Sequence, residues 1–490
     1  MKRSFLAHIS KAVVALSMLA ALSAAPHAHA GGGARGRVVK GPWMQHVTPT
    51  SAIVRVEVDP PSAVTLEIGM STLPGSADSG VGSVVESLEI RALHSILLQN
   101  LEPATRYTFT VRAAGAQKYG AITTAPREDS GAAFRFQVYG DNRSDDAAHA
   151  AVVRAMVAVP ADFLINTGDL VENGASAAQW QTFFDIEAPL TRERCIFSCV
   201  GNHELVDGSG AEYVRYFGPA EAPVVLPRPA SSLAGPPIAI PIPLDAAMAP
   251  LSLEQLSGTY RWSNARFFLV NGMVDYRTGP TRAWLEKALV DADKEPGLVW
   301  RIVVVHFGPW SSGPHGDNAH LHDGNIPALL RAHSVDLVIS GHDHIYERGA
   351  ADGLPYLVSG GGGAPVYRIK KASPTSIRYE SVRHFIDASA SPAAIQFVAT
   401  RSDGSTIERC ALRKNGGWDC DGAKSVLASA SGELSPAPSS SASSLPAASR
   451  TGASSKCGCR TVGVAGGGAT AACVALACAA LLALRRRDRD

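Results

Sequence analysis

The chain has 490 residues, of which 46% are hydrophobic and 18% charged, and its formal net charge is +1 at pH 7. This length favours about two or three domains over a single core, and the composition is typical of a globular protein and not of a disordered one. A nearly balanced charge, with no basic stripe in the globular part, argues against a nucleic-acid partner.

The two ends of the chain carry signals for export. Two basic residues precede an apolar run at 12–22, and Ala28-His-Ala30 forms a small-x-small cleavage site, so we expect a secretory signal peptide over 1–30. Residues 461–484 carry no charge and are long enough to cross a bilayer, and three arginines follow at 485–487. The sequence therefore predicts an exported protein with a C-terminal transmembrane anchor, and a buried helix is the alternative.

The segment before this run supports the same location. Residues 425–456 are rich in Ser, Ala and Pro, which is typical of a flexible stalk. Cys457-Gly-Cys459 then opens the segment 457–490, in which the apolar run and the arginines follow. This order resembles the sorting signal of myxobacterial surface proteins, which implies anchoring at the cell surface, whereas a plain membrane anchor is the alternative.

Four further cysteines fall into two pairs. Cys410 and Cys420 lie on either side of a short turn in the extension 406–424 and are predicted to form a disulfide, as an oxidising compartment allows. Cys195 and Cys199 are four residues apart in an apolar strand, too far to bond to each other, and are predicted to be core thiols.

Residues 37–126 are predicted to form an all-β domain. Apolar and polar positions alternate at 52–58, 63–68 and 107–111, and two prolines are expected to separate the first two strands. The run Leu101-Glu-Pro-Ala-Thr-Arg-Tyr107 matches a Leu-x-Pro-x-Thr-x-Tyr turn. It resembles the tyrosine corner of fibronectin type III-like domains, which implies an N-terminal β-sandwich.

Residues 131–405 change to an alternation of short apolar runs and helical patterns, which predicts a layered α/β domain of the αββα type. Its expected strands are 134–139, 162–166, 195–200, 267–270, 302–305 and 335–340, and its expected helices are 145–159, 175–188 and 281–291. The proline-rich stretch 219–250 has no periodicity and is expected to be a surface insertion near the site.

Polar clusters follow five of these strands. Their members, in chain order, are Asp141, Asp169, Asn202 with His203 and Glu204, His306, and His342 with His344. Loops at the carboxyl ends of strands form the ligand crevice of open α/β sheets, so these clusters should converge. Carboxylate, amide and imidazole groups suit Mn, Fe or Zn. One aspartate can bridge two such ions, and a metal-bound water would then attack a phosphate ester.

The five clusters resemble the metallophosphoesterase (calcineurin-like) superfamily. Residues 341–348 (Gly-His-Asp-His-Ile-Tyr-Glu-Arg) and 359–364 (Ser-Gly-Gly-Gly-Gly-Ala) resemble its purple acid phosphatase branch, which also has an N-terminal fibronectin-like domain. The resemblance implies that Asp169 bridges two metal ions. It also implies that Asp141 and His344 bind the first ion, here called metal one, and that metal two is bound by Asn202, His306 and His342.

The resemblance implies further roles around the substrate. His203 would donate a proton to the leaving group or stabilise the charge on it, and Glu204 would orient the His203 ring. The loop after His306 would place His315 and His320 against the substrate, a small phosphate ester.

Two positions depart from the family pattern. Arg143 stands where a metal-one histidine is usual, and Glu172 stands where the purple acid phosphatases have a tyrosine ligand. Arginine is permanently charged and cannot bind a metal, so metal one lacks a ligand unless Glu172 or water supplies it. Arg143 is predicted to hold a phosphate oxygen, and a structural ion pair is the alternative.

Together these features predict an exported, metal-dependent enzyme that hydrolyses phosphomonoesters at a dinuclear site. A phosphodiesterase or nucleotide hydrolase is one alternative. A surface phosphate- or metal-binding protein whose catalytic site has decayed is the other.

Overall fold

The computed structural model describes residues 37–70, 83–113, 115–206, 210–218, 238–241, 256–414 and 417–420. The predicted signal peptide, stalk and C-terminal sorting segment all lie outside these residues. Within the described part of the chain, no helix is long and apolar enough to cross a membrane.

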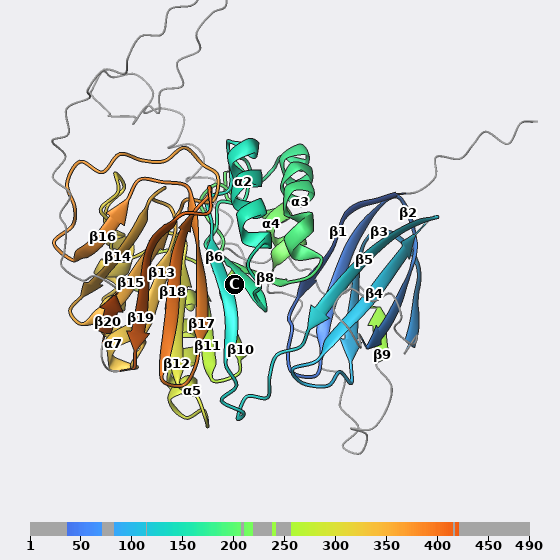
Figure 1. The fold of residues 1–490 in the computed structure, drawn as a ribbon, viewed down its shortest axis with the longest axis horizontal. Coiled ribbons are helices and arrows are strands. Elements are labelled where there is room, and N and C mark those ends of the chain that lie inside the picture. Colours follow the sequence, from blue (N-terminus) through green and yellow to red (C-terminus); the bar gives the residue numbers. More distant parts are fainter. Residues whose placement is uncertain are drawn as a thin grey trace, which may run out of the picture. The chain divides into compact units, whose positions relative to one another are not determined.

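The N-terminal domain consists of antiparallel strands. They are β1 (Arg37–Gln45), β2 (Ala52–Met70), β3 (Ser83–Gln99), β4 (Arg106–Ala113) and β5 (Ala116–Thr123) (Figure 1). The prediction that two prolines separate two strands at 52–68 is wrong, because β2 runs through them. They lie at a register irregularity between Glu57 and Val64, where a residue without an N–H does not interrupt the strand pairing.

The predicted tyrosine turn has a defined geometry. Tyr107 is buried, and its hydroxyl accepts a hydrogen bond of 2.8 Å from the backbone N–H of Glu102. A hydroxyl that bonds to the backbone a few residues upstream is the contact expected of a tyrosine corner. The relation to fibronectin type III domains stays a prediction.

One short stretch of the proline-rich insertion is described. Strand β9 (Ile238–Pro241) pairs with β3 through Ile96–Gln99, so this part of the insertion extends the N-terminal sheet. The rest of 219–250 lies outside the described residues.

The second domain contains two sheets. In the first, β6 (Phe134–Tyr139), β7 (Phe163–Asn166) and β8 (Cys195–Ser198) are parallel to one another. Four antiparallel strands extend it beyond β6, in the order β17 (His384–Ala390), β18 (Ala394–Arg401), β19 (Thr406–Arg413) and β20 (Gly417–Cys420). The described strands of the extension predicted at 406–424, β19 and β20, therefore belong to this sheet, and its cysteines form the predicted disulfide, Cys410–Cys420.

The second sheet has a parallel centre with antiparallel neighbours. Its order is β10 (Gly258–Trp262), β11 (Ala265–Val270), β12 (Trp300–Val305), β13 (Leu337–Ser340), β15 (Leu354–Ser359), β14 (Tyr346–Ala351) and β16 (Ser376–Glu380). Strands β11, β12, β13 and β15 are parallel, so their carboxyl ends meet at one edge.

The two sheets pack face to face, with helices on their outer faces (Figure 1). Phe136 and Phe163 of the first sheet each lie 5.5 Å from the Phe267 ring of the second. Helices α2 (Asp146–Val157), α3 (Ala177–Thr191) and α4 (Ala211–Phe217) share an apolar core with the first sheet. Helices α5 (Pro280–Asp293), α6 (Ala319–Asp323) and α7 (Ile326–Ala332) share one with the second. This arrangement confirms the predicted α/β layered fold.

Local signals in the sequence set the element ends. Strand β6 begins and ends where predicted, and the side chain of Asp145 caps α2 by accepting the N–H of Ala148. Cys195 and Cys199 are buried free thiols, as predicted.

Candidate metal centre

Three candidate site residues have positive φ angles, which residues other than glycine rarely adopt. Asp141, Asp169 and His342 have φ values of 57°, 56° and 68°. Asp141 and Asp169 follow β6 and β7, and His342 follows β13. Such strained residues persist where the surrounding structure holds them, and they concentrate at functional sites.

Three donor atoms predicted for metal two lie close to the fourth, His306 Nε2. His306 Nε2 lies 3.3 Å from Asp169 Oδ1, 3.2 Å from Asn202 Oδ1 and 3.2 Å from His342 Nδ1. Ligand atoms held about 2.1 Å from one ion lie roughly 3.0–3.4 Å from each other in octahedral or tetrahedral geometry. The spacing of these atoms therefore matches the edges of a coordination shell.

The protonation of His306 also fits a cation at this point. Its Nδ1 lies 2.9 Å from the carbonyl oxygen of Thr167, which can only accept, so Nδ1 carries a proton, and in the neutral ring Nε2 presents a lone pair. In that form of the ring, Asp169 Oδ1 and Asn202 Oδ1 also present lone pairs toward Nε2, and a bound cation would relieve this repulsion. Burial, and then the nearby His306 and His315, lower the pKa of His342 to about 2, which keeps its ring neutral and able to bind a metal.

Close packing places Asp169 in this group. A Cβ atom on Gly201 would lie 2.2 Å from Asp169 Oδ1, so only glycine fits there. Burial raises the pKa of Asp169, but His306, His203 and Arg143 outweigh it and hold the pKa below its usual range. Asp169 is therefore a charged carboxylate in the interior.

The donor atoms predicted for metal one form a less complete group. His344 Nε2 lies 3.5 Å from Asp141 Oδ1, and His344 Nδ1 is fixed by the carbonyl oxygen of Pro365 at 2.7 Å. Asp141 Oδ1 is buried without a hydrogen-bond partner, and Asp141 Oδ2 accepts the N–H of His342 at 3.0 Å. Asp141, Asp169 and His306 together form a buried group with ligand atoms within 4.8 Å of one another.

Arg143 lies within this second group. Its Nε donates to Asp169 Oδ2 at 3.1 Å, its Nη1 donates to Glu172 at 2.7 Å, and its Nη2 is 3.4 Å from His344 Nε2. The ion-pair alternative for Arg143 is therefore present in the structure. Two of the three donor atoms predicted for metal one face a guanidinium.

Glu204 does not orient His203, so that prediction is wrong. Its two oxygens instead accept the backbone N–H groups of Asp169, Leu170, Val171 and Gly201. Burial, and then the charge of Asp169, raise the pKa of Glu204 to about 8, while these N–H groups oppose the rise. Glu204 therefore ties the loop after β7 to the loop after β8.

A backbone carbonyl holds His203 instead. The ring Nδ1 lies 2.7 Å from the carbonyl oxygen of Glu172, and Nε2 lies 3.8 Å from Asp169 Oδ2. The Glu172 carbonyl can only accept, so Nδ1 donates and Nε2 faces the metal centre.

The two histidines predicted to contact substrate differ in position. The ring of His315 lies 4.2 Å from that of His342, and its Nδ1 bonds Asp343 at 2.8 Å. This hydrogen bond raises the pKa of His315. His320 is exposed on α6, and within the described part of the chain no contact joins its ring to the other candidate residues.

Aromatic residues that the sequence reading missed surround the group. Tyr367 stacks on His344 with ring centres 4.0 Å apart, and Phe307 lies 4.3 Å from the His342 ring. Tyr367 follows the glycine-rich segment 359–364, in which Gly362 donates its N–H to the carbonyl of Gly140 beside Asp141. That segment is the signal from which Tyr367 could have been found.

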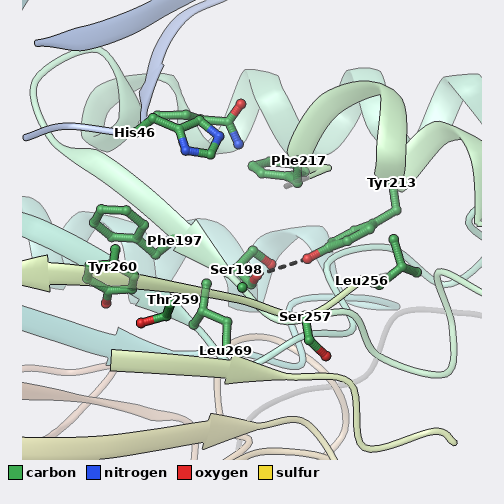
Figure 2. Close-up of a pocket in the computed structure, with 12 residues that line it drawn as sticks. His46, Phe197, Ser198, Tyr213, Phe217, Leu256, Ser257, Thr259, Tyr260 and Leu269 are labelled. Carbon is green, nitrogen blue, oxygen red and sulfur yellow. Dashed lines mark hydrogen bonds between the residues drawn. The ribbon is translucent and has the colours of Figure 1, made fainter. Parts of the chain in front are cut away.

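A separate pocket of about 310 Å³ lies between the N-terminal domain and the layered domain (Figure 2). Its wall includes His46, Phe197, Tyr213 and Tyr260, and Tyr213 donates a hydrogen bond of 2.9 Å to the carbonyl of Ser198. None of the predicted site residues lines it, so the metal centre and this pocket are distinct.

Comparison with known proteins agrees with this centre. The sequence matches the calcineurin-like phosphoesterase family over residues 134–346, which include every residue predicted to bind a metal. These residues form a calcineurin-like metallophosphoesterase domain.

Among curated relatives, purple acid phosphatase 17 of Arabidopsis thaliana is 37% identical over 95 residues, which cover 18% of this chain and 28% of that protein. An uncharacterized Mycobacterium tuberculosis protein is 26% identical over 316 residues, 56% of each chain. The chain thus spans less than a third of the first plant relatives.

Solved structures share the fold of the metallophosphoesterase domain and its neighbouring strands. Purple acid phosphatase PPD1 from yellow lupin (Lupinus luteus) has a TM-score of 0.60 at 16% identity, covering 76% of this chain and 74% of that one. The structure of PhoD has a TM-score of 0.59 at 10% identity, covering 79% of this chain and 92% of that one. At these identities the likeness concerns the fold alone.

Proposed function

We propose that this protein is a metal-dependent phosphoesterase that hydrolyses phosphate monoesters. The observation that carries the proposal is the convergence of Asp169, Asn202 and His342 on His306 Nε2 at 3.2–3.3 Å. A divalent ion held by these residues would supply Lewis acidity toward a phosphoryl oxygen. Of the two ions predicted from the sequence, the proposed function requires only metal two. Phosphate monoesters are proposed because purple acid phosphatases are among the relatives, and diesters are the alternative substrate.

The protein's own groups would then act on the substrate. His203 presents Nε2 toward the centre and would deliver a proton to the leaving oxygen, while the Glu172 carbonyl keeps the ring in position. His315 lies at the exposed rim, and its hydrogen bond to Asp343 favours a positive ring that would attract the phosphate. Glu204 holds the loop that carries Asp169 and so keeps this ligand in place.

Hydrolysis of para-nitrophenyl phosphate with added Mn²⁺, Zn²⁺ or Fe²⁺ tests the proposal. Asp169→Asn removes a charged ligand and should lower metal-dependent turnover by more than about 100-fold. Asp291→Asn is the matched control, because Asp291 pairs with Lys287 on an exposed helix face and should leave turnover unchanged. Full activity of Asp169→Asn would contradict the proposal.

A second candidate is a surface binding protein with a decayed site, and the ion pair between Arg143 and Asp169 favours it. This candidate predicts that metal and phosphate bind without turnover of any ester.

Comparing para-nitrophenyl phosphate with its bis-aryl diester separates monoesterase from diesterase activity in the same assay.

The proposed location is outside the cytoplasmic membrane. The disulfide between Cys410 and Cys420 supports it, because such bonds persist in oxidising compartments.

A further inference from the structure

The side chain of Arg143 is enclosed among the donor atoms predicted for metal one. It is 12% exposed, and its guanidinium lies between Asp169 Oδ2, at 3.1 Å from Nε, and His344 Nε2, at 3.4 Å from Nη2. A metal ion bound by the same two atoms would have to share this space with a group that is charged at every physiological pH.

We infer that the Arg143 guanidinium takes the place of metal one, so that the centre combines one metal ion with one fixed organic cation. The inference rests on the proposed function and specifies its cofactor. The metal ion would be held at His306 Nε2, with the donor atoms of Asn202 and His342 each 3.2 Å from that atom. The guanidinium lies with His344, on the opposite oxygen of Asp169. Asp169 therefore bridges a metal ion and an arginine instead of two metal ions.

Neighbouring groups hold the guanidinium in this position. Nη1 donates to Glu172 at 2.7 Å and to the Ser144 hydroxyl at 3.2 Å, and that hydroxyl also bonds Glu172. Oε2 of Glu172 is thereby engaged with Arg143 and Ser144. The two residues that depart from the family pattern are thus partners of each other.

Asp141 keeps one carboxylate oxygen without a hydrogen bond beside the guanidinium. Its Oδ1 is buried without a hydrogen bond, 3.5 Å from His344 Nε2. A second ion bound between these atoms would compete with Arg143 for His344 Nε2 and would face its positive charge at close range. Removing the guanidinium should therefore open a second metal position made of Asp141, Asp169 and His344.

Metal content measured on the full-length protein tests this inference. Purified wild-type protein is loaded with excess Mn²⁺, freed of unbound ion, and measured by mass spectrometry of the metal and by electron paramagnetic resonance. We expect about one Mn²⁺ per chain with the signal of an isolated ion. Arg143→Ala and Arg143→His should bind about two, with the signal of an exchange-coupled pair. Arg135→Ala is the matched control, since Arg135 lies on β6 and pairs with Asp387 away from the centre, and it should keep about one.

Each outcome decides the inference. About two coupled ions in the wild type would overturn it, and this measurement needs no variant to fold. One ion in folded Arg143→Ala and Arg143→His, as in the wild type, would also overturn it, because Arg143 would then not be what excludes the second ion. Hydrolysis by a protein with two ions refutes this inference and leaves the proposed function intact. A protein with one ion and no hydrolysis agrees with this inference and contradicts the proposed function.

Discussion

Replacing Glu204 by glutamine should destabilise the loops that carry the metal ligands. The carboxylate accepts N–H groups from Leu170 at 2.8 Å and Val171 at 3.3 Å on one oxygen, and from Asp169 at 2.9 Å and Gly201 at 2.8 Å on the other. Glutamine keeps one acceptor oxygen and turns its own N–H groups toward the other two donors.

The magnitude follows from these contacts. A buried N–H group left without its acceptor costs about 1–3 kcal/mol, and Glu204 is fully buried, so water does not replace the two bonds that glutamine loses. We therefore expect the free energy of unfolding to fall by about 2–6 kcal/mol. The measurement belongs at about pH 7, because burial raises the pKa of Glu204 to about 8 and above that pH the buried charge itself destabilises the folded state.

Urea denaturation followed by tryptophan fluorescence measures this change. A chelator in both samples removes the stabilisation that a bound metal would add to the folded state. Glu193→Gln is the matched control, because Glu193 forms an exposed pair with Arg106 that is worth less than about 1 kcal/mol. A loss for Glu204→Gln no larger than that of the control would refute the reasoning.

Two further predictions concern buried polar side chains. Burial lowers the pKa of His384 to about 4, so between pH 6.5 and 4 only the unfolded chain takes up this proton, and stability is lost as the pH falls. His384→Gln should remove about 3 kcal/mol of that loss when denaturation is compared at pH 7 and pH 4, and an unchanged pH dependence would contradict it. Tyr107→Phe removes the bond from the Glu102 N–H and should cost about 0.5–1.5 kcal/mol in urea denaturation. Exposed Tyr119→Phe is its control, and equal effects would count against the corner.

The sequence by itself indicated the strands that precede the polar clusters, which are β6, β7, β8, β12 and β13, and the polar residues that follow them. Strand β6 could be predicted residue by residue, because an apolar run followed by Gly140 and Asp141 is a local signal. The same reasoning identified His306, whose Nε2 is the atom on which the other metal-two donors converge. These features depend on the order of residue types along a short stretch. That order can be read from the sequence without knowledge of the fold.

Only the tertiary structure decided how side chains from different strands pair. Arg143 and His344 are 201 positions apart, and nothing near either residue indicates that a guanidinium lies against that imidazole. Glu204 adjoins His203 in sequence but points the other way, toward backbone N–H groups of the loop after β7. Such contacts depend on side-chain direction across converging loops, and that direction is set by packing. The sequence therefore predicted residues that the fold brings together, and the fold decided which of them lie around His306 Nε2 and which lie against Arg143.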